Sequence, residues 1–339
     1  MTDKFLVSVS RCSSYEADEV YNALADALEM IGGWPKTNMP NELLFKTNLL
    51  APKPPDKAVT THPSVVRALI KLVRNSGFSG KITVADSPGH LHADKKEELL
   101  KLTGMLDAVK DDGNAVATIL SDAGFVTLKR PSNVVLKDLS VSKRYYEAPF
   151  VVNIAKLKTH VETEITACVK NCFGIADTDT RKKAHLSTSI NRLCNAIIDL
   201  YSINPPKINI LDGIYAMEGN GPTHGKPRFA GLLMASENAL AVDFVAAKAM
   251  GYKDPLDIPL INLAAKRGIG PSSMSDITII GIDPDNLEIK GFAKRASSSR
   301  MLPTWLRGWA HRWVALSPHL QEVNCIRCGV CVKVCPKSA

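Results

Sequence analysis

The chain has 339 residues, of which 45% are hydrophobic and 22% are charged. This composition supplies a core for one large domain or two ordinary ones, and it excludes wholesale disorder, a collagen-like chain and a small disulfide-rich scaffold. The net charge of +8 comes from residues 290–339, where nine lysines and arginines accompany one acid, Glu322. Since the first 289 residues are neutral overall, we expect no nucleic acid on the body and an acidic surface as partner of the tail.

Short β-rich runs alternate with helical stretches, a pattern typical of an α/β fold. The strands predicted in chain order are 5–9, 43–47, 82–85, 150–154, 208–211, 231–235 and 277–280. The predicted helices are 17–31, 63–76, 94–103, 113–123, 190–201, 239–250 and 258–267. We therefore expect a mostly parallel sheet with helices on both faces, built as one doubly wound domain or as two joined lobes.

Polar side chains gather at the ends of three predicted strands, where open α/β sheets bind ligands. Lysines in such positions favour an anionic ligand, and the carboxylates among them suit proton donation or a divalent metal ion. The bland alternative is that the lysines are merely solvated. The candidate catalytic or ligand-binding residues are Lys46, Asp86, Lys156, Lys158, His160, Asp212 and Glu218.

Further features supplement these candidates. Residues 181–185 form a predicted basic loop, and Lys170 and Asn171 lie near an expected helix start. Glycines from Gly213 to Gly225 indicate a tight loop, explained equally by close ligand approach or by plain turn geometry. They match neither a phosphate-binding P-loop nor the dinucleotide fingerprint.

Several residues are expected to be structural. Cys168 and Cys172 share a helix face and could bind a metal ion, supply an extra cluster ligand or pack in the core, and we favour packing. Cys12 and Cys194 are likewise expected in the core. His62, which precedes a proline at a helix start, is expected to be a cap or loop residue.

Four cysteines near the C-terminus, Cys325, Cys328, Cys331 and Cys335, are followed by Pro336 in the spacing C-x2-C-x2-C-x3-C-P. Bacterial ferredoxins bind a [4Fe-4S] cluster with this spacing, because short gaps aim several soft thiolates at one cube. Zinc is the competing metal, but zinc sites usually pair two C-x2-C knuckles across a longer gap. We therefore predict a [4Fe-4S] cofactor.

The source of the fourth cluster ligand has three explanations. In two-cluster ferredoxins the last cysteine of such a run binds the other cluster, and the sequence holds one copy of the motif. We favour a shortened form of a longer protein. Alternatively, one cluster uses all four local cysteines, or another thiol completes it.

The change of composition near residue 290 predicts that the chain has three parts. They are a body over 1–289, a basic linker over 290–322 and the cysteine motif over 323–339. The linker contains an apolar helical stripe made of Leu302, Trp305, Trp309, Trp313 and Leu316. We favour a stripe that packs the cluster module against the body. The alternative is contact of residues 302–316 with the surface of an anionic membrane.

Several motifs together resemble the DUF362 family of iron-sulfur proteins. They are Lys156-Leu-Lys-Thr-His160, the run 166–174, the run 212–222, Ala241-Val-Asp243 and the terminal cysteine motif. The resemblance extends from Phe45 to Pro336, with two departures. Thr47 replaces an expected proline, and a second ferredoxin motif is missing. The resemblance implies a cluster-bearing protein.

We hypothesise an iron-sulfur electron-transfer protein or oxidoreductase. In this hypothesis the body binds a small anionic ligand, and the tail exchanges electrons with that ligand and with a redox partner protein. The alternative is a non-catalytic redox-sensing or ligand-binding module with a structural cluster. The opening Met1-Thr2-Asp3-Lys4 has no signal-peptide layout and no apolar run reaches membrane-spanning length, so we expect a cytoplasmic location.

Overall fold

The computed structural model describes residues 4–35, 37–89, 92, 94–185 and 189–294. The described residues all belong to one compact unit, Met1–Arg295. The four motif cysteines and the stripe at 302–316 lie outside the described residues, so the expectations about them remain predictions.

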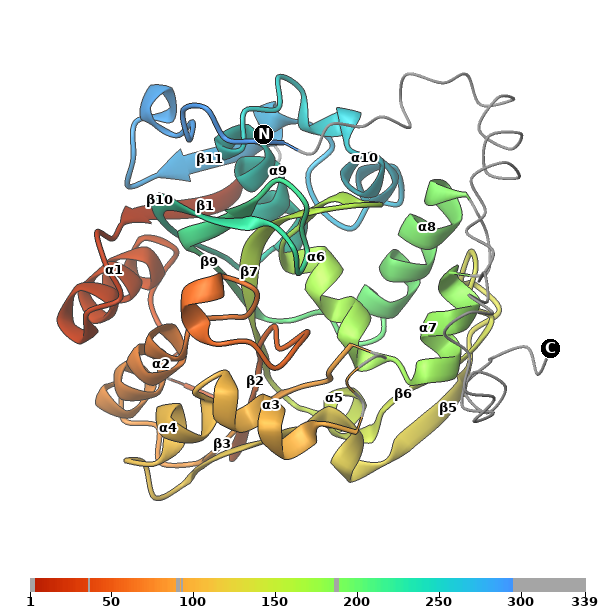
Figure 1. The fold of residues 1–339 in the computed structure, drawn as a ribbon, viewed down its shortest axis with the longest axis horizontal. Coiled ribbons are helices and arrows are strands. Elements are labelled where there is room, and N and C mark those ends of the chain that lie inside the picture. Colours follow the sequence, from red (N-terminus) through yellow and green to blue (C-terminus); the bar gives the residue numbers. More distant parts are fainter. Residues whose placement is uncertain (1–3, 36, 90–91, 93, 186–188, 295–339) are drawn as a thin grey trace, which may run out of the picture. The chain divides into compact units, whose positions relative to one another are not determined.

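A nine-stranded mixed sheet occupies the centre of the described part of the chain (Figure 1). Five of its pairings are parallel, which confirms the expected α/β class. The antiparallel pairings join β10 to β1 and β9, and β8 to β7. Across the sheet the strands follow in the order β11 (Ile277–Ile280), β1 (Phe5–Arg11), β10 (Lys226–Ser236), β9 (Ile208–Glu218), β7 (Val151–His160), β2 (Glu42–Lys46), β3 (Lys81–Asp86) and β4 (Ala115–Ile119), while β8 (Glu164–Thr166) pairs with β7.

Helices cover both faces of this sheet, so its central strands are buried on both sides. Side chains of β7 alternate between two cores: Val152 and Ile154 join the core under α1 and α2, while Ala155 and Leu157 join the core under α8 and α9. All ten residues of β7 are consequently buried. The helices are α1 (Ala17–Met30), α2 (Pro63–Asn75), α3 (Lys96–Leu102), α4 (Met105–Val109), α5 (Lys143–Glu147), α6 (Cys168–Asn171), α7 (Thr178–His185), α8 (Ile190–Tyr201), α9 (Ala239–Ala249) and α10 (Pro259–Lys266).

Two predicted elements are wrong. Residues 113–123, expected as a helix, form β4 and a short 3-10 turn, because the run from Ala115 pairs in parallel with β3 as an edge strand. Residues 181–185, expected as a loop, belong to α7, which packs against α8 and β6 (Asp138–Ser142). The small hairpin of β5 (Phe125–Lys129) and β6 was not predicted.

Two predicted elements have different bounds. The strand expected over 150–154 continues to His160, since β8 and β9 pair with its second half. Lys156, Lys158 and His160 therefore lie on β7 rather than after it. Gly213 lies within β9 rather than in a loop, and the turn between β9 and β10 begins at Gly219, which has a φ of 76°.

Candidate anion-binding site

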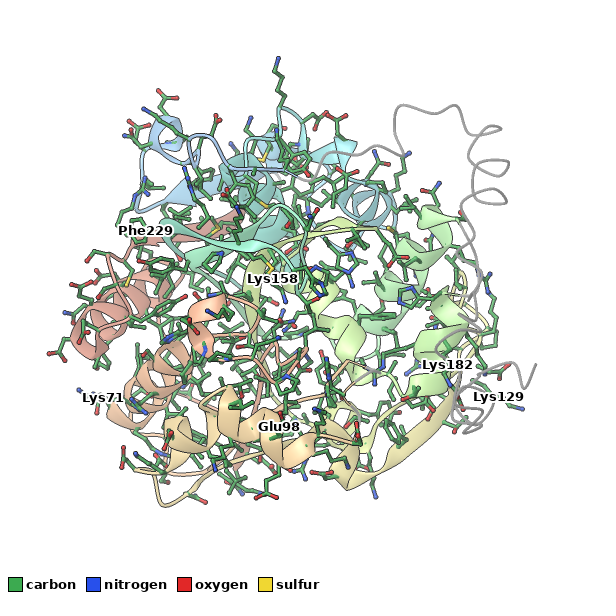
Figure 2. The ribbon with its side chains drawn as sticks, viewed as in Figure 1. Lys71, Glu98, Lys129, Lys158, Lys182 and Phe229 are labelled. Carbon is green, nitrogen blue, oxygen red and sulfur yellow. The ribbon has the colours of Figure 1, made fainter. Side chains whose placement is uncertain are left out.

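A cavity of about 620 Å³ lies at the carboxyl ends of β2, β3 and β7, as expected for a parallel sheet. Helices α6 and α7 form its other side, and Figure 2 places Lys158 near the middle of the molecule and Lys182 on α7. This volume suits a small organic ligand. The cavity is lined by Asn48, Leu50, Asp86, Ser87, Gly89, Lys158, His160, Thr166, Lys170, Asn171, Phe173, Gly174, Thr178, Arg181, Lys182, His185 and Pro222.

The lining of this cavity is strongly cationic. Among the described lining residues, four are lysines or arginines and Asp86 is the single carboxylate. Asp86 is itself paired with Lys46, whose Nζ lies 2.6 Å from Asp86 Oδ1, and both side chains are almost fully buried. Since this acid already has a counter-ion and Lys182 lies near Asp179, the net positive charge of the described lining comes from Lys170, Arg181 and the protonated fraction of Lys158.

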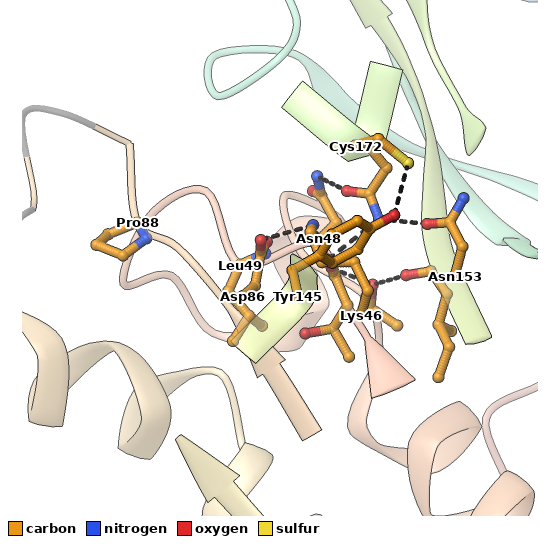
Figure 3. Close-up of polar contacts among 12 residues, drawn as sticks. Lys46, Asn48, Leu49, Asp86, Pro88, Tyr145, Asn153 and Cys172 are labelled. Atoms are coloured by element: carbon orange, nitrogen blue, oxygen red, sulfur yellow. Dashed lines mark hydrogen bonds and ion pairs between the residues drawn. The ribbon is translucent and has the colours of Figure 1, made fainter. Parts of the chain in front are cut away.

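The Lys46–Asp86 ion pair holds a carboxylate that lines the cavity (Figure 3 labels both residues). Lys46 also donates to the carbonyl of Thr47 at 2.8 Å, and Asp86 Oδ2 accepts from the backbone N–H of Leu49 at 2.6 Å. A Cβ at Gly174 would lie 2.9 Å from Asp86 Oδ1, so a residue without a side chain is needed here. Lys46 does not line the cavity, and the geometry gives it a supporting role.

Lys158 is fully buried and has no carboxylate partner among the described residues. Its Nζ donates to Asn48 Oδ1 and to the carbonyl oxygen of Val59, each at 2.7 Å. Burial, reinforced by the charge of neighbouring Lys170, lowers the pKa of Lys158 to about 7. Near neutral pH this side chain therefore exists both as an ammonium ion and as a free amine.

A line of side-chain amides orients the acceptor of Lys158. Each amide NH2 donates to the oxygen of the next, and the last donates to the backbone carbonyl of Glu237, with N–O distances from 2.8 to 3.1 Å (Figure 3 labels two of the amides). Because a carbonyl can only accept, the far end fixes the direction of the whole line. The Asn48 oxygen thereby faces Lys158. The line consists of Asn48, Asn171, Asn153 and Asn209.

Cations on α6 and α7 complete the cavity. Burial lowers the pKa of Lys170 to about 8, and its Nζ lies 5.0 Å from the ring centre of Phe173. Arg181 donates from Nη1 to the carbonyl of Pro88 at 2.9 Å, whereas its buried Nε has no partner among the described residues. A buried donor without an acceptor is costly, and a ligand oxygen would satisfy it. Lys182 is more exposed and lies 3.7 Å from Asp179.

His160 contributes from the end of β7. Its Nδ1 accepts from the backbone N–H groups of Glu162 and Thr163, at 3.1 and 3.3 Å. An imidazole that accepts at Nδ1 carries its proton on Nε2. A second histidine of the lining, His185 on α7, places Nδ1 3.6 Å from Glu162 Oε1 and packs edge-on against the ring of Phe173.

Lys156 and Asp212 belong to a separate buried cluster. Lys156 Nζ lies 2.9 Å from Asp212 Oδ2 and donates to Tyr15 Oη at 2.7 Å, and Tyr15 in turn donates to Asp212 Oδ1 at 2.7 Å. The ring of His62 stacks on Tyr15 at 3.5 Å, and burial next to Asp212 raises the pKa of Tyr15. Burial lowers the pKa of His62 to about 4. Because Tyr15 is far away in the sequence, no local pattern could have predicted this cluster.

The remaining candidates lie apart from the cavity. Glu218, at the end of β9, accepts a hydrogen bond from the backbone of Ala293 at 2.9 Å. His62 caps α2, as predicted, by accepting from Ser64 N. Asp243 on α9 is fully buried and accepts from the N–H groups of Cys168 and Val169, while burial raises its pKa to about 7.

The four cysteines of the body are buried, which confirms their expected place in the core. Burial raises the pKa of Cys172 to about 11 and that of Cys168 as well, so both remain thiols. Within the described ranges no group of three or more potential ligands could hold a metal ion. No helix in the same ranges is long and apolar enough to cross a bilayer.

Comparisons with known proteins support the family resemblance of the body of the chain. The family model described as a domain of unknown function, DUF362, matches residues 43–248. The "Thylakoid-associated protein sll1697" of Synechocystis sp. is 34% identical over 275 residues, which cover 79% of this chain and 81% of that protein.

Two solved structures are similar at a lower level. A structural-genomics protein from Thermotoga maritima gives a TM-score of 0.43 at 13% identity, over 76% of this chain and 60% of that one. The lactate racemase apoprotein of Thermoanaerobacterium thermosaccharolyticum gives 0.37 at 11% identity, over 69% of this chain and 54% of that one. Neither similarity carries an argument about function here.

Proposed function

The chain belongs to the DUF362 family, and we propose that its body binds a small organic anion that exchanges electrons with an iron-sulfur cluster held by its tail. The observation that carries the anion-binding half is the cationic cavity, whose one carboxylate is already paired with Lys46. Charges buried without counter-ions are costly. A bound anion would offset this cost, because it acts as the counter-ion of the buried cations.

The residues divide the work of binding in this proposal. Arg181 supplies a buried N–H that has no acceptor among the described residues, and Lys170 supplies a charge of the same sign from α6. Phe173 and Leu50 give the cavity an apolar part suited to the carbon skeleton of an organic molecule. The ligand is therefore an organic anion of modest size.

The cluster is assigned from the chemistry of its donors. Four thiolates in the ferredoxin spacing suit iron and sulfide, and the residues that would hold the cluster are Cys325, Cys328, Cys331 and Cys335. The cysteines of the body are poor alternatives because they are buried thiols with raised pKa values. A bound [4Fe-4S] cluster supplies one-electron transfer. It would exchange electrons with the bound anion and with a redox partner protein.

Calorimetric titration of the full chain with phosphate, sulfate, pyruvate and citrate tests the cavity. We expect at least one of these anions to bind, and Arg181→Met and Lys170→Met each to weaken that binding about tenfold or more, because each removes a charge-assisted contact. Lys71→Met on α2 is the matched control, since it removes an exposed lysine far from the cavity (Figure 2). Equal losses in all three variants would refute the assignment.

Iron and acid-labile sulfide assays on anaerobically purified protein test the cluster. We expect about four iron atoms per chain and loss of iron in Cys328→Ala. Cys12→Ala removes a buried thiol of the body and should keep the iron. Colourless protein, or zinc in place of iron, would end the electron-transfer proposal.

The rival function is a redox sensor that binds the same anion without reacting with it. A reduced cluster that is reoxidised by a bound anion supports the electron-transfer proposal. A cluster that cycles with no effect from any cavity ligand supports the sensor.

A second candidate property is peripheral membrane contact. The curated relative is named for a thylakoid association, and residues 302–316 carry three tryptophans on one predicted helical stripe. Sedimentation with anionic liposomes, with and without residues 290–322, tests it. Equal sedimentation of both forms would refute it.

A further inference from the structure

Three buried lysines of neighbouring strands differ in their partners. Lys46 lies 2.6 Å from the Asp86 carboxylate, and Lys156 lies 2.9 Å from the Asp212 carboxylate. Lys158, which is equally buried, contacts only neutral oxygens among the described residues. The first two lysines are therefore built as ion pairs, and Lys158 is built differently.

The hydrogen bonds of Lys158 suit a neutral amine. An uncharged Nζ has two hydrogens and one lone pair, and the described structure gives it two acceptors, Asn48 Oδ1 and the Val59 carbonyl. Both acceptors are fixed, the first by the amide line and the second by the backbone. The lone pair then occupies the remaining tetrahedral direction of a side chain that lines the cavity.

We propose that Lys158 is a nucleophile that forms an imine with the carbonyl carbon of a small keto acid bound in the cavity. This inference rests on the anion-binding function proposed above, since Lys170 and Arg181 would hold the carboxylate of the keto acid. A lysine without a counter-ion beside another cation is an arrangement that activates an amine for this chemistry. The lowered pKa of Lys158, about 7, agrees with a substantial neutral fraction at physiological pH.

The reaction balances without an oxidant or a reductant. Nζ forms a bond to the carbonyl carbon and transfers a proton to the carbonyl oxygen, which gives a carbinolamine. The carbon–oxygen bond then breaks, and the oxygen leaves as water with both hydrogens that came from Nζ. The product is a carbon–nitrogen double bond that a hydride reagent can reduce to a stable amine.

Borohydride trapping of the full chain tests the proposal. Protein incubated with pyruvate and then reduced with sodium borohydride should gain the mass of the keto acid less one oxygen atom, and peptide mapping should place the gain on Lys158. Lys158→Arg should abolish the label, whereas Lys71→Arg, which changes an exposed lysine of α2 outside the cavity, should retain it. Circular dichroism and the melting curve show whether each variant is folded.

Three outcomes separate this inference from the function it rests on. If pyruvate, sulfate or phosphate binds by calorimetry but pyruvate and 2-oxoglutarate leave Lys158 unlabelled, the nucleophile is refuted while anion binding stands. If no anion binds, both fall. If acetone and pyruvate at equal concentration label Lys158 to the same extent, the keto-acid class is refuted. Recognition of the carboxylate predicts at least tenfold more labelling by pyruvate.

Discussion

Replacement of Lys158 by methionine should change how the stability of the protein depends on pH. Methionine keeps the length and apolar character of the stem but cannot be protonated. In the wild type, burial lowers the pKa of Lys158 from 10.5 to about 7. Between these two values the unfolded chain binds a proton on Lys158 and the folded chain does not.

The sign and size of the effect follow from this difference. Where the unfolded state binds one proton more than the folded state, the free energy of unfolding rises by about 1.4 kcal/mol per pH unit. The wild type should therefore gain ~3 kcal/mol relative to Lys158→Met between pH 7.5 and 9.5. Below pH about 7 both states are protonated and the difference should become constant.

Urea unfolding of both proteins at intervals across this range measures the difference directly, because other titrating groups cancel. Lys71→Met, which removes an exposed lysine of α2, should run parallel to the wild type at every pH. Parallel curves for Lys158→Met as well would show that Lys158 keeps its proton in the folded state. They would refute the amine interpretation of the cavity.

Three further predictions concern the Lys156–Asp212 ion pair, Gly174 and the salt dependence of anion binding. Asp212→Asn leaves Lys156 as a buried ammonium without a counter-ion, so the free energy of unfolding in urea should fall by about 3–5 kcal/mol. Glu147→Gln, which removes one partner of an exposed ion pair, should lower it by less than ~0.5 kcal/mol. A loss below about 1 kcal/mol in Asp212→Asn would contradict the buried ion pair. Gly174→Ala should weaken anion binding, because the added Cβ approaches Asp86 Oδ1 to 2.9 Å; unchanged affinity by calorimetry would contradict that contact. Anion affinity should fall as sodium chloride rises, since salt screens the cations and chloride competes for them; a salt-independent affinity would point to apolar binding.

The sequence predicted the sheet and most helices because their signals are local. Apolar spacing and terminal residues identify α1 and α2 without tertiary information. Residues 113–123 were misassigned because Ala115 and its neighbours become a strand only by pairing with β3, and that partner is chosen by the fold. Tertiary pairing thus overrode a weak helical preference.

The sequence predicted most residues of the candidate site, but not that they divide between the cavity and the separate Lys156–Asp212 cluster. Lys156 and Lys158 are two residues apart on β7, and nothing local distinguishes them. Asp212 on β9 forms an ion pair with Lys156, whereas the side-chain partner of Lys158 is the neutral amide of Asn48. The pairing register between β7 and β9 shifts between these two lysines, a feature that depends on strands distant in sequence.

The directed line of amides that ends at Glu237 has a property that the surrounding charges lack. Carboxamides neither gain nor lose protons in the physiological range, so acidification that recharges Lys158 or Lys170 leaves the line as it is. Reversing one member would force every other to turn, against a terminal carbonyl that cannot donate. The side-chain acceptor of Lys158 therefore keeps its orientation when a change of pH alters the charge of the amine.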